Sequence, residues 1–385
     1  MDKRDFCITK NGAVVLIAAV TLLAAFVWIF GSIRNSGRET GIFDRDNFAT
    51  RPVMAVSEAV SHGEISMKHI EFINDNFYNR FSFSYRELYT AQWIVEELLS
   101  MGYTWDDIEV QEFTWDASRD TYPMESFDIL PGVGAMDIFF MLDSMPFIHL
   151  DLRPSQMSQN VILTVPGKSE QFIVVGAHYD SVMYPGASDN ASGTALLLES
   201  AQRMRYLDNY YTIVYVFFGA EEVGILGAFY YINSWSQQEH DNLLFMINAD
   251  VLLDGPDLFY MAGYSSSHSD SLSGANHITE TWDTIAQAVS AEHGINLMPF
   301  PQGAFGPSDQ LAFIYNDHTV MFLIGMNEVD GWYDQDIMNV IFEMATVLHS
   351  PRDDFHYINQ TWPGKIEMNM HAFSIFLEEL LLGAY

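Results

Sequence analysis

Histidine and carboxylate side chains stand at the ends of three strongly apolar runs of this sequence. His178 ends the run FIVVGAH and Asp250 ends LLFMINAD, while Glu221 and Glu222 directly follow TIVYVFFGA. Continuous apolar runs that alternate with helical segments indicate an α/β fold, with a mostly parallel central sheet flanked by helices on both faces. Ligands bind such sheets outside the carboxyl ends of the strands, so these side chains are predicted to meet at one edge.

Another carboxylate, Asp189, lies in the stretch SDNASGTA between the first two runs. It stands at the start of a predicted helix near residues 192–206, from which it can reach the same edge. Asp189 could instead have a purely structural role as a helix cap, because aspartate at a helix start accepts backbone hydrogen bonds. The two roles can coexist. The small residues around it allow the backbone to approach its neighbours closely.

This mixture of ligand types suits zinc, which binds neutral imidazole and ionised oxygen at about 2.0–2.2 Å. Two adjacent glutamates at the end of an apolar run would repel each other as a bare pair. A bound cation makes Glu222 a ligand and leaves Glu221 free to act as a general base. A zinc-dependent hydrolase is therefore the expected chemistry.

Five motifs occur in the order HYDS, SDNASGTA, GAEEVGILGA, NAD and HSPRDD. Over roughly residues 67–385 the chain resembles the co-catalytic, two-zinc family of bacterial secreted leucine-type aminopeptidases, and it also resembles glutaminyl cyclases and the transferrin receptor ectodomain. The resemblance implies a zinc-exopeptidase-like sandwich that holds two Zn²⁺ ions per chain. It also implies removal of single residues from peptides with free N-termini.

The resemblance further implies a role for each ligand. Asp189 would bridge the two ions. Glu222 and His349 would complete one site, and His178 and Asp250 would complete the other.

Three more assignments follow from the same resemblance. Glu221 would be the general base, and Asp180, two residues after His178, would hold the ring of that histidine by a hydrogen bond. His356 competes with His349 as the last ligand, and we favour His349 because it begins the HSPRDD match.

One position departs from the family pattern. Several relatives carry a tyrosine that donates a hydrogen bond to the developing oxyanion, a few residues before a Ser-Asp pair. The corresponding stretch GAFGPSDQ carries Phe305 instead. Loss of one such donor costs about 2.7–4 kcal/mol of transition-state stabilisation, unless Tyr264 or Tyr315 replaces it.

Two other functions stay open on this scaffold. A glutaminyl-cyclase-like transferase would use a single zinc ion, so metal content and ammonia release distinguish it. A non-catalytic, receptor-like ectodomain would have an impaired metal site, which the full ligand set disfavours. The sequence does not indicate the preferred N-terminal residue or the oligomeric state.

Several elements are predicted around these motifs. Apolar positions at helical spacing predict an amphipathic helix over residues 85–101 and a helix near 366–382 that packs on the sheet. Strands are expected at residues 108–115 and 160–165.

The composition excludes one class of partner. The chain has 51 acidic and 17 basic residues, for a formal net charge of -34. Nucleic acid would be repelled by this charge. The single cysteine, Cys7, precedes every predicted element of the catalytic domain, so no disulfide can stabilise that domain.

An uncharged apolar run over residues 12–33 is long enough to cross a membrane as a helix. Its length and bulky end favour an uncleaved signal anchor over a cleaved signal peptide. We expect a cytoplasmic segment at residues 1–11, a stalk at 34–66, and a zinc peptidase domain at 67–385. The domain would lie on the extracytoplasmic side of the membrane, or be secreted if the anchor is cleaved.

Overall fold

The computed structural model describes residues 43, 60–114, 151–153, 155–263, 277–299, 308–326 and 347–383. They belong to the second of two units into which the chain divides, Phe43–Tyr385. None of the helices in these segments is long and apolar enough to span a membrane. The predicted anchor at residues 12–33 lies outside the described residues.

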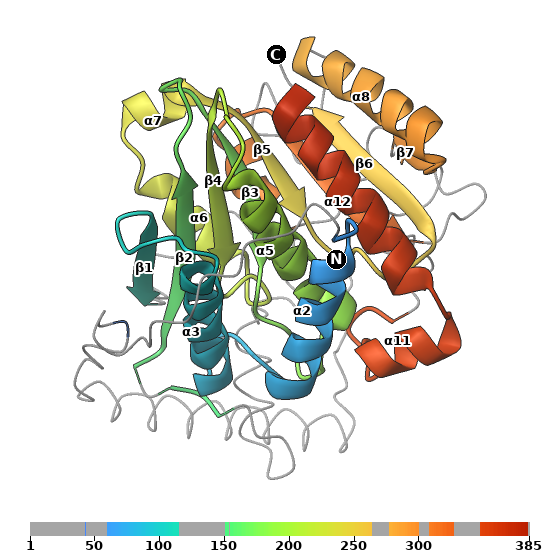
Figure 1. Ribbon diagram of the computed structural model, residues 1–385. Coiled ribbons are helices and arrows are strands. Elements are labelled where there is room, and N and C mark those ends of the chain that lie inside the picture. The colour runs from blue at the N-terminus through green and yellow to red at the C-terminus, as the bar shows by residue number, and fades with distance from the viewer. Residues whose placement is uncertain are drawn as a thin grey trace, which may run out of the picture. The chain divides into compact units, whose positions relative to one another are not determined.

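One eight-stranded sheet forms the centre of the described fold (Figure 1). Its strand order is β1-β2-β4-β3-β5-β8-β6-β7. The strands are β1 (Ile108–Thr114), β2 (Met157–Val165), β3 (Phe172–His178), β4 (Thr212–Phe218), β5 (Leu243–Ala249), β6 (Asp257–Gly263), β7 (Leu297–Pro299) and β8 (Val320–Met326).

The expectation of a mostly parallel sheet is wrong at its edges, because the sheet is mixed. The central strands β4, β3, β5 and β8 run parallel to one another. At one side β1 pairs antiparallel with β2 and β2 with β4, and at the other side β6 pairs antiparallel with β8. Helices connect β3 to β4 and β4 to β5, so each of these strands begins at the same edge of the sheet and runs in the same direction. The connections from β2 to β3 and from β5 to β6 are short and contain no helix, so the chain reverses direction there.

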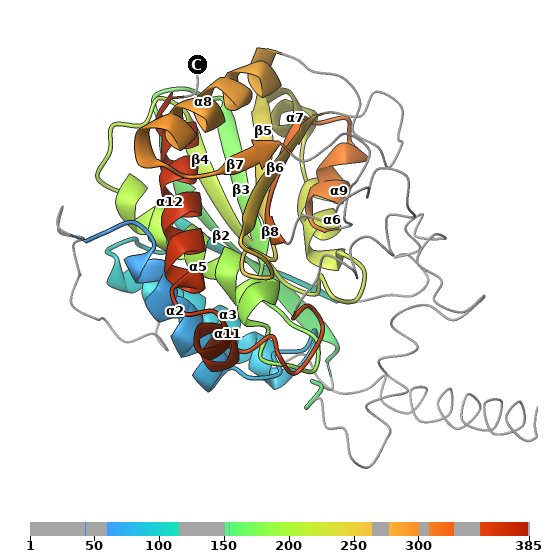
Figure 2. The same ribbon diagram turned by 90° about the vertical axis from the view of Figure 1, so that its right-hand side faces the viewer.

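Helices cover both faces of the sheet, as expected (Figures 1 and 2). The larger hydrophobic core lies beneath the helices of one face and the smaller core beneath α6 and α9 on the other. The first group is α2 (Glu64–Asn76), α3 (Tyr85–Ser100), α5 (Ser192–Met204), α8 (His277–His293) and α12 (Lys365–Gly383). The other face carries α6 (Leu226–Asn233) and α9 (Gln310–Ile314). α7 (Gln237–Asn242) leads into β5, and α11 (Phe355–Thr361) packs against α2 and α12.

Two helices predicted from apolar spacing are confirmed. In α3 the side chains of the predicted stripe are all buried, and the Ser84 hydroxyl caps the helix by accepting from the Glu87 amide. Gly102 follows the helix with φ of 92°, a left-handed conformation that glycine adopts without steric conflict. The second helix, α12, packs against α5, α8 and α2.

The start of α2 depends on a buried carboxylate of α5. Glu199 is fully buried and accepts hydrogen bonds from the backbone amides of Gly63 and Ser66, each at 2.8 Å. The hydroxyls of Ser66 and Ser374 and the guanidinium of Arg203 also donate to it. These donors lower the pKa of Glu199 although burial alone would raise it. One charged group thus joins α2, α5 and α12.

We predict that Glu199→Ala lowers the free energy of unfolding by about 3 kcal/mol, because it leaves buried amides and a guanidinium without their acceptor. Urea denaturation followed by circular dichroism measures the change. Glu64→Ala is the control, since the Glu64–Lys68 pair on α2 is solvent-exposed and should contribute little. Equal midpoints for the two variants would contradict this role of Glu199.

Candidate metal centre

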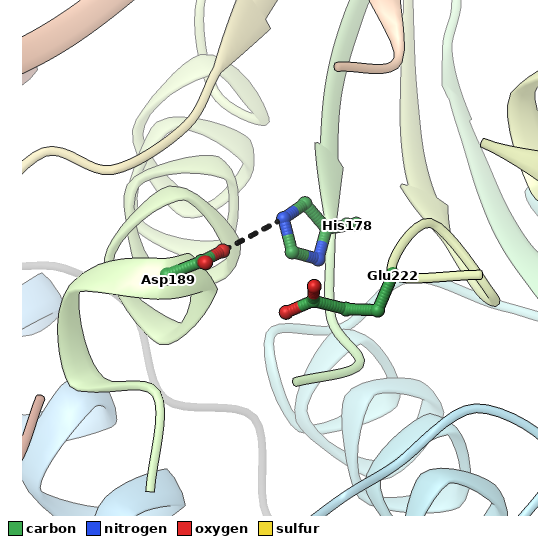
Figure 3. A group of neighbouring side chains, drawn as sticks. All are labelled: His178, Asp189 and Glu222. Carbon is green, nitrogen blue, oxygen red and sulfur yellow. Dashed lines mark ion pairs between the residues drawn. The ribbon is translucent and has the colours of Figure 1, made fainter. Parts of the chain in front are cut away.

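The predicted ligands meet at the edge of the sheet where the parallel strands end. His178 is the last residue of β3 and is 1% exposed. Asp250 directly follows β5, and Glu221 and Glu222 lie in the loop after β4. Figure 3 shows His178, Asp189 and Glu222 converging from a strand end, a short helical turn and a loop. Ligand atoms of these three residues all lie within 4.8 Å of one another.

Asp189 lies between the two histidines. It belongs to the short turn η3 (Ala187–Ala191) that leads into α5. Its Oδ1 is 3.1 Å from His178 Nε2, and its Oδ2 is 3.0 Å from His349 Nε2. The start of α5 lies close to the end of β5, because a Cβ added to Gly193 would stand 2.2 Å from the carbonyl oxygen of Ala249. Glycine is therefore required there, because even alanine would clash with this backbone oxygen.

Each histidine also contacts one further carboxylate. His178 Nε2 is 3.2 Å from Asp250 Oδ1, and His349 Nε2 is 3.3 Å from Glu222 Oε2. Glu221 Oε2 lies 4.0 Å from His178 Nε2, farther away than the other carboxylates. The side chains therefore form two groups that share Asp189.

Asp180 organises three residues of this edge. Its carboxylate is 3.4 Å from His178 Nδ1, on the opposite side of the ring from Asp189, and its backbone oxygen is 3.2 Å from the same nitrogen. It also accepts the backbone amides of Glu221, at 3.1 Å, and Glu222, at 3.3 Å. One buried carboxylate thus orients the imidazole and fixes the two glutamates.

Two further aspartates hold the backbone at the remaining predicted ligands, and sequence reasoning did not assign them. Asp353 accepts the backbone amides of Ser188 and Asp189. Asp254 accepts those of Val347 and Leu348, directly before His349. Asp353 lies within the HSPRDD motif, whereas Asp254 follows the NAD motif without any local signal.

The charges at this edge are unbalanced among the protein groups alone. Burial raises the pKa of Glu221 well above its ordinary value, and the charge of Asp309 raises it further. Burial also raises the pKa of Glu222, and the charge of Asp189 adds to the effect. For His178, burial lowers the pKa, but the surrounding carboxylates, Asp250 above all, raise it well above its ordinary value. The site therefore attracts positive charge.

The donor set fits zinc. Two imidazole nitrogens and several carboxylate oxygens face one another, and these are the ligand types that zinc prefers. Within the described segments, Asp250 Oδ1 is buried and has no hydrogen-bond partner, although it lies 3.2 Å from His178 Nε2. A cation placed among these atoms would supply the missing partner and offset the repulsion between the carboxylates.

The other residues named from the sequence lie elsewhere or outside the described segments. His356 pairs with Asp75 on the surface, at 2.8 Å. Tyr315 packs against the ring of Phe229. Phe305 and Tyr264 lie outside the described residues, so the oxyanion donor stays unassigned.

Asp309 is a further acidic residue near this edge that sequence reasoning did not assign. It is fully buried, and neither of its carboxylate oxygens has a hydrogen-bond partner among the residues that the structure describes. Ser308 and Gln310 on either side of it accept from Asn248 of β5, which fixes the backbone beside the ligands. Burial raises the pKa of Asp309 well above its ordinary value.

Residues 160–374 match the model of peptidase family M28. The chain belongs to this family. It is 29% identical over 215 residues to the aminopeptidase YwaD of Bacillus subtilis, a match that covers 54% of this chain and 42% of that protein. The matches cover between 31% and 65% of the first three curated relatives, so the chain spans less than two thirds of each.

Solved structures show the same fold. The M28 chain is similar to BSAP, a zinc aminopeptidase from Bacillus subtilis, with a TM-score of 0.57 and 18% identity over 84% of this chain and 96% of that one. It is similar to a glutaminyl cyclase from an Acidobacteriales bacterium, with a TM-score of 0.56 and 17% identity over 86% and 98%. At these identities the likeness concerns the fold alone.

We predict that Asp353→Asn weakens zinc binding by about 10- to 100-fold, because an amide has only one oxygen for the two backbone amides that orient Asp189. Competition with a chromophoric zinc chelator measures the affinity. Asp354→Asn makes the same charge change at the next residue, where the carboxylate caps α11, and should leave zinc affinity unchanged. Equal losses in both variants would indicate a general charge effect.

Proposed function

We propose that this M28 peptidase is a zinc-dependent aminopeptidase that removes single residues from peptides with free N-termini. Two Zn²⁺ ions would share Asp189 as a bridging ligand. His178 and Asp250 would complete one site, and Glu222 and His349 the other.

One observation carries the proposal: the two oxygens of Asp189 face different histidines, and each histidine contacts its own further carboxylate. A single ion would need only one such group, whereas this arrangement offers a separate set of donors on either side of Asp189. The names of the relatives support the same reading, since YwaD is an aminopeptidase and BSAP a zinc aminopeptidase.

Zinc bound here would polarise the scissile carbonyl and lower the pKa of the attacking water. The protein's own contribution is a base beside the ligands. Glu221 lies at this edge with its Oε2 farther from His178 than the carboxylates of Asp189 and Asp250, and its backbone is fixed by Asp180. We propose that Glu221 takes a proton from the water and returns it to the leaving amine.

The electrostatics of the edge favour a substrate that ends in an amine. The buried carboxylates create a negative field that attracts a free α-ammonium group and repels a terminal carboxylate. This supports the proposed aminopeptidase activity over a carboxypeptidase activity. From the sequence alone, we also propose that residues 12–33 anchor the chain in a membrane. The peptidase domain would then lie on the extracytoplasmic side.

The proposal predicts stepwise loss of N-terminal residues from peptides with free N-termini and no reaction with their acetylated counterparts. Zinc-loaded protein is incubated with matched pairs of peptides, with and without a chelator, and mass spectrometry identifies the products. A peptide that begins with glutamine is included, because ammonia release without shortening would indicate the glutaminyl-cyclase-like alternative. Folded, zinc-loaded protein that alters none of the peptides would favour the receptor-like alternative.

A second prediction separates the base from the ligands. Glu221→Gln should lower turnover by at least about 100-fold while zinc stays bound, because the amide cannot accept the proton. Asp189→Ala should lose zinc as well, since it removes oxygens from both groups. Metal content and turnover are measured on the same preparations. Normal turnover by Glu221→Gln would remove this residue from the mechanism, and full zinc content in Asp189→Ala would contradict bridging.

A further inference from the structure

Arg80 is a fully buried arginine close to the metal centre. Its Nε donates to the backbone oxygen of Tyr179 at 2.6 Å, and its two terminal nitrogens donate to the backbone oxygens of Pro185 and Gly186. Burial lowers the pKa of Arg80 to about 10, so the guanidinium is protonated at neutral pH. A charged group that makes three hydrogen bonds to carbonyls of one loop is strongly fixed.

These carbonyls belong to the two ends of a single loop. Tyr179 directly follows His178, and Gly186 directly precedes the turn that carries Asp189. Gly186 has φ of 60°, and an added Cβ would stand 2.2 Å from the Asp189 carbonyl oxygen, so the loop turns tightly. A single guanidinium therefore sets the separation between two proposed ligands.

Neighbouring residues of the same segment reach two other parts of the site. The Ser82 hydroxyl donates to Asp180 Oδ2, the carboxylate that also holds His178. The buried Glu87 carboxylate accepts from the amide of Ala220, directly before Glu221, at 3.0 Å. Residues 80–87 thus contact both the loop that joins β3 to the turn before α5 and the loop that follows β4. The segment lies outside residues 160–374, which match the family model.

We propose that residues 80–87 form a brace that sets the metal geometry, with Arg80 as its main positioning residue. The inference rests on the proposed function, because it concerns ligands of the zinc centre assigned there. In this reading, the rigid fork of the guanidinium matters more than its charge, since three carbonyls at different positions must be held together.

A pure counter-charge role makes the opposite prediction for zinc. The positive charge of Arg80 faces several carboxylates of the site, among them Asp353, Asp180 and Asp189. If Arg80 only neutralised these groups, its charge would compete with zinc for them. Removing the charge would then tighten zinc binding, and Arg80→Lys would leave it unchanged.

The test measures the zinc affinity of the full chain by competition with a chromophoric chelator, for wild type, Arg80→Lys and Arg80→Met. The brace predicts affinity at least about 10-fold weaker in both variants, because lysine has one nitrogen for three carbonyls. Unchanged affinity in Arg80→Lys, or tighter binding in Arg80→Met, would overturn it.

Arg203→Lys is the matched control. Like Arg80, Arg203 has three acceptors, here the Glu199 carboxylate and the carbonyls of Val60 and Ser61, but it lies near the far end of α5 from Asp189. It should lose some stability and keep its zinc affinity. An equal loss of zinc affinity in Arg203→Lys would mean that any arginine with several acceptors has this effect, and the brace would be rejected.

A milder variant keeps the inference testable if the Arg80 variants do not fold. Ser82→Ala removes one hydroxyl from the Asp180 carboxylate and should weaken zinc binding by a few-fold, with little change in unfolding of the chelator-treated protein. Unchanged zinc affinity in this variant would count against the brace. Wild-type protein that binds no zinc would instead refute the proposed function, so the two failures are distinct.

Discussion

Each oxygen of Asp189 contacts a different imidazole, that of His178 or that of His349. Further acidic side chains surround this carboxylate at a buried edge of the sheet. Charges of one sign repel strongly in such surroundings and each one loses its hydration. Hydrogen bonds from the two histidines lower the pKa of Asp189 although burial opposes this, whereas Glu221 and Glu222 have raised pKa values. The arrangement is stable only with positive charge among the carboxylates.

Histidine protons and zinc are alternative sources of that positive charge. Among the protein groups alone, nearby carboxylates raise the pKa of both histidines, that of His349 to about 12. Zinc binds neutral imidazole, so a bound ion would displace these protons and supply its own charge to the same oxygens. Metal binding would therefore also balance the charges of the acidic edge, so the stability of the fold depends on the proposed metal site.

The sequence predicts that several of the proposed ligands meet, because they stand at the ends of apolar runs. His178, Asp250 and the Glu221–Glu222 pair each follow a buried strand, and the parallel arrangement of these strands brings them together. The mixed edges of the sheet were not predicted, since β2 is buried along almost its whole length and reads like a parallel strand. Whether two consecutive strands run parallel or antiparallel depends on whether a helix connects them. The apolar pattern of a strand does not contain that information.

The groups that position the ligands were harder to find, for a related physical reason. Asp254 acts on the backbone of residues 347–348, and Arg80 acts on carbonyls about a hundred residues further along the chain. Their partners are backbone atoms, which every residue possesses, so no pairing of residue types signals these contacts. A polypeptide that began at β2 would carry every proposed ligand and the proposed base, yet it would lack Arg80, Ser82 and Glu87, which hold the loops between them. The proposed catalytic unit is therefore larger than the stretch that carries its recognisable motifs, and the helices α2 and α3 with the loop between them contribute to the site as well as to the fold.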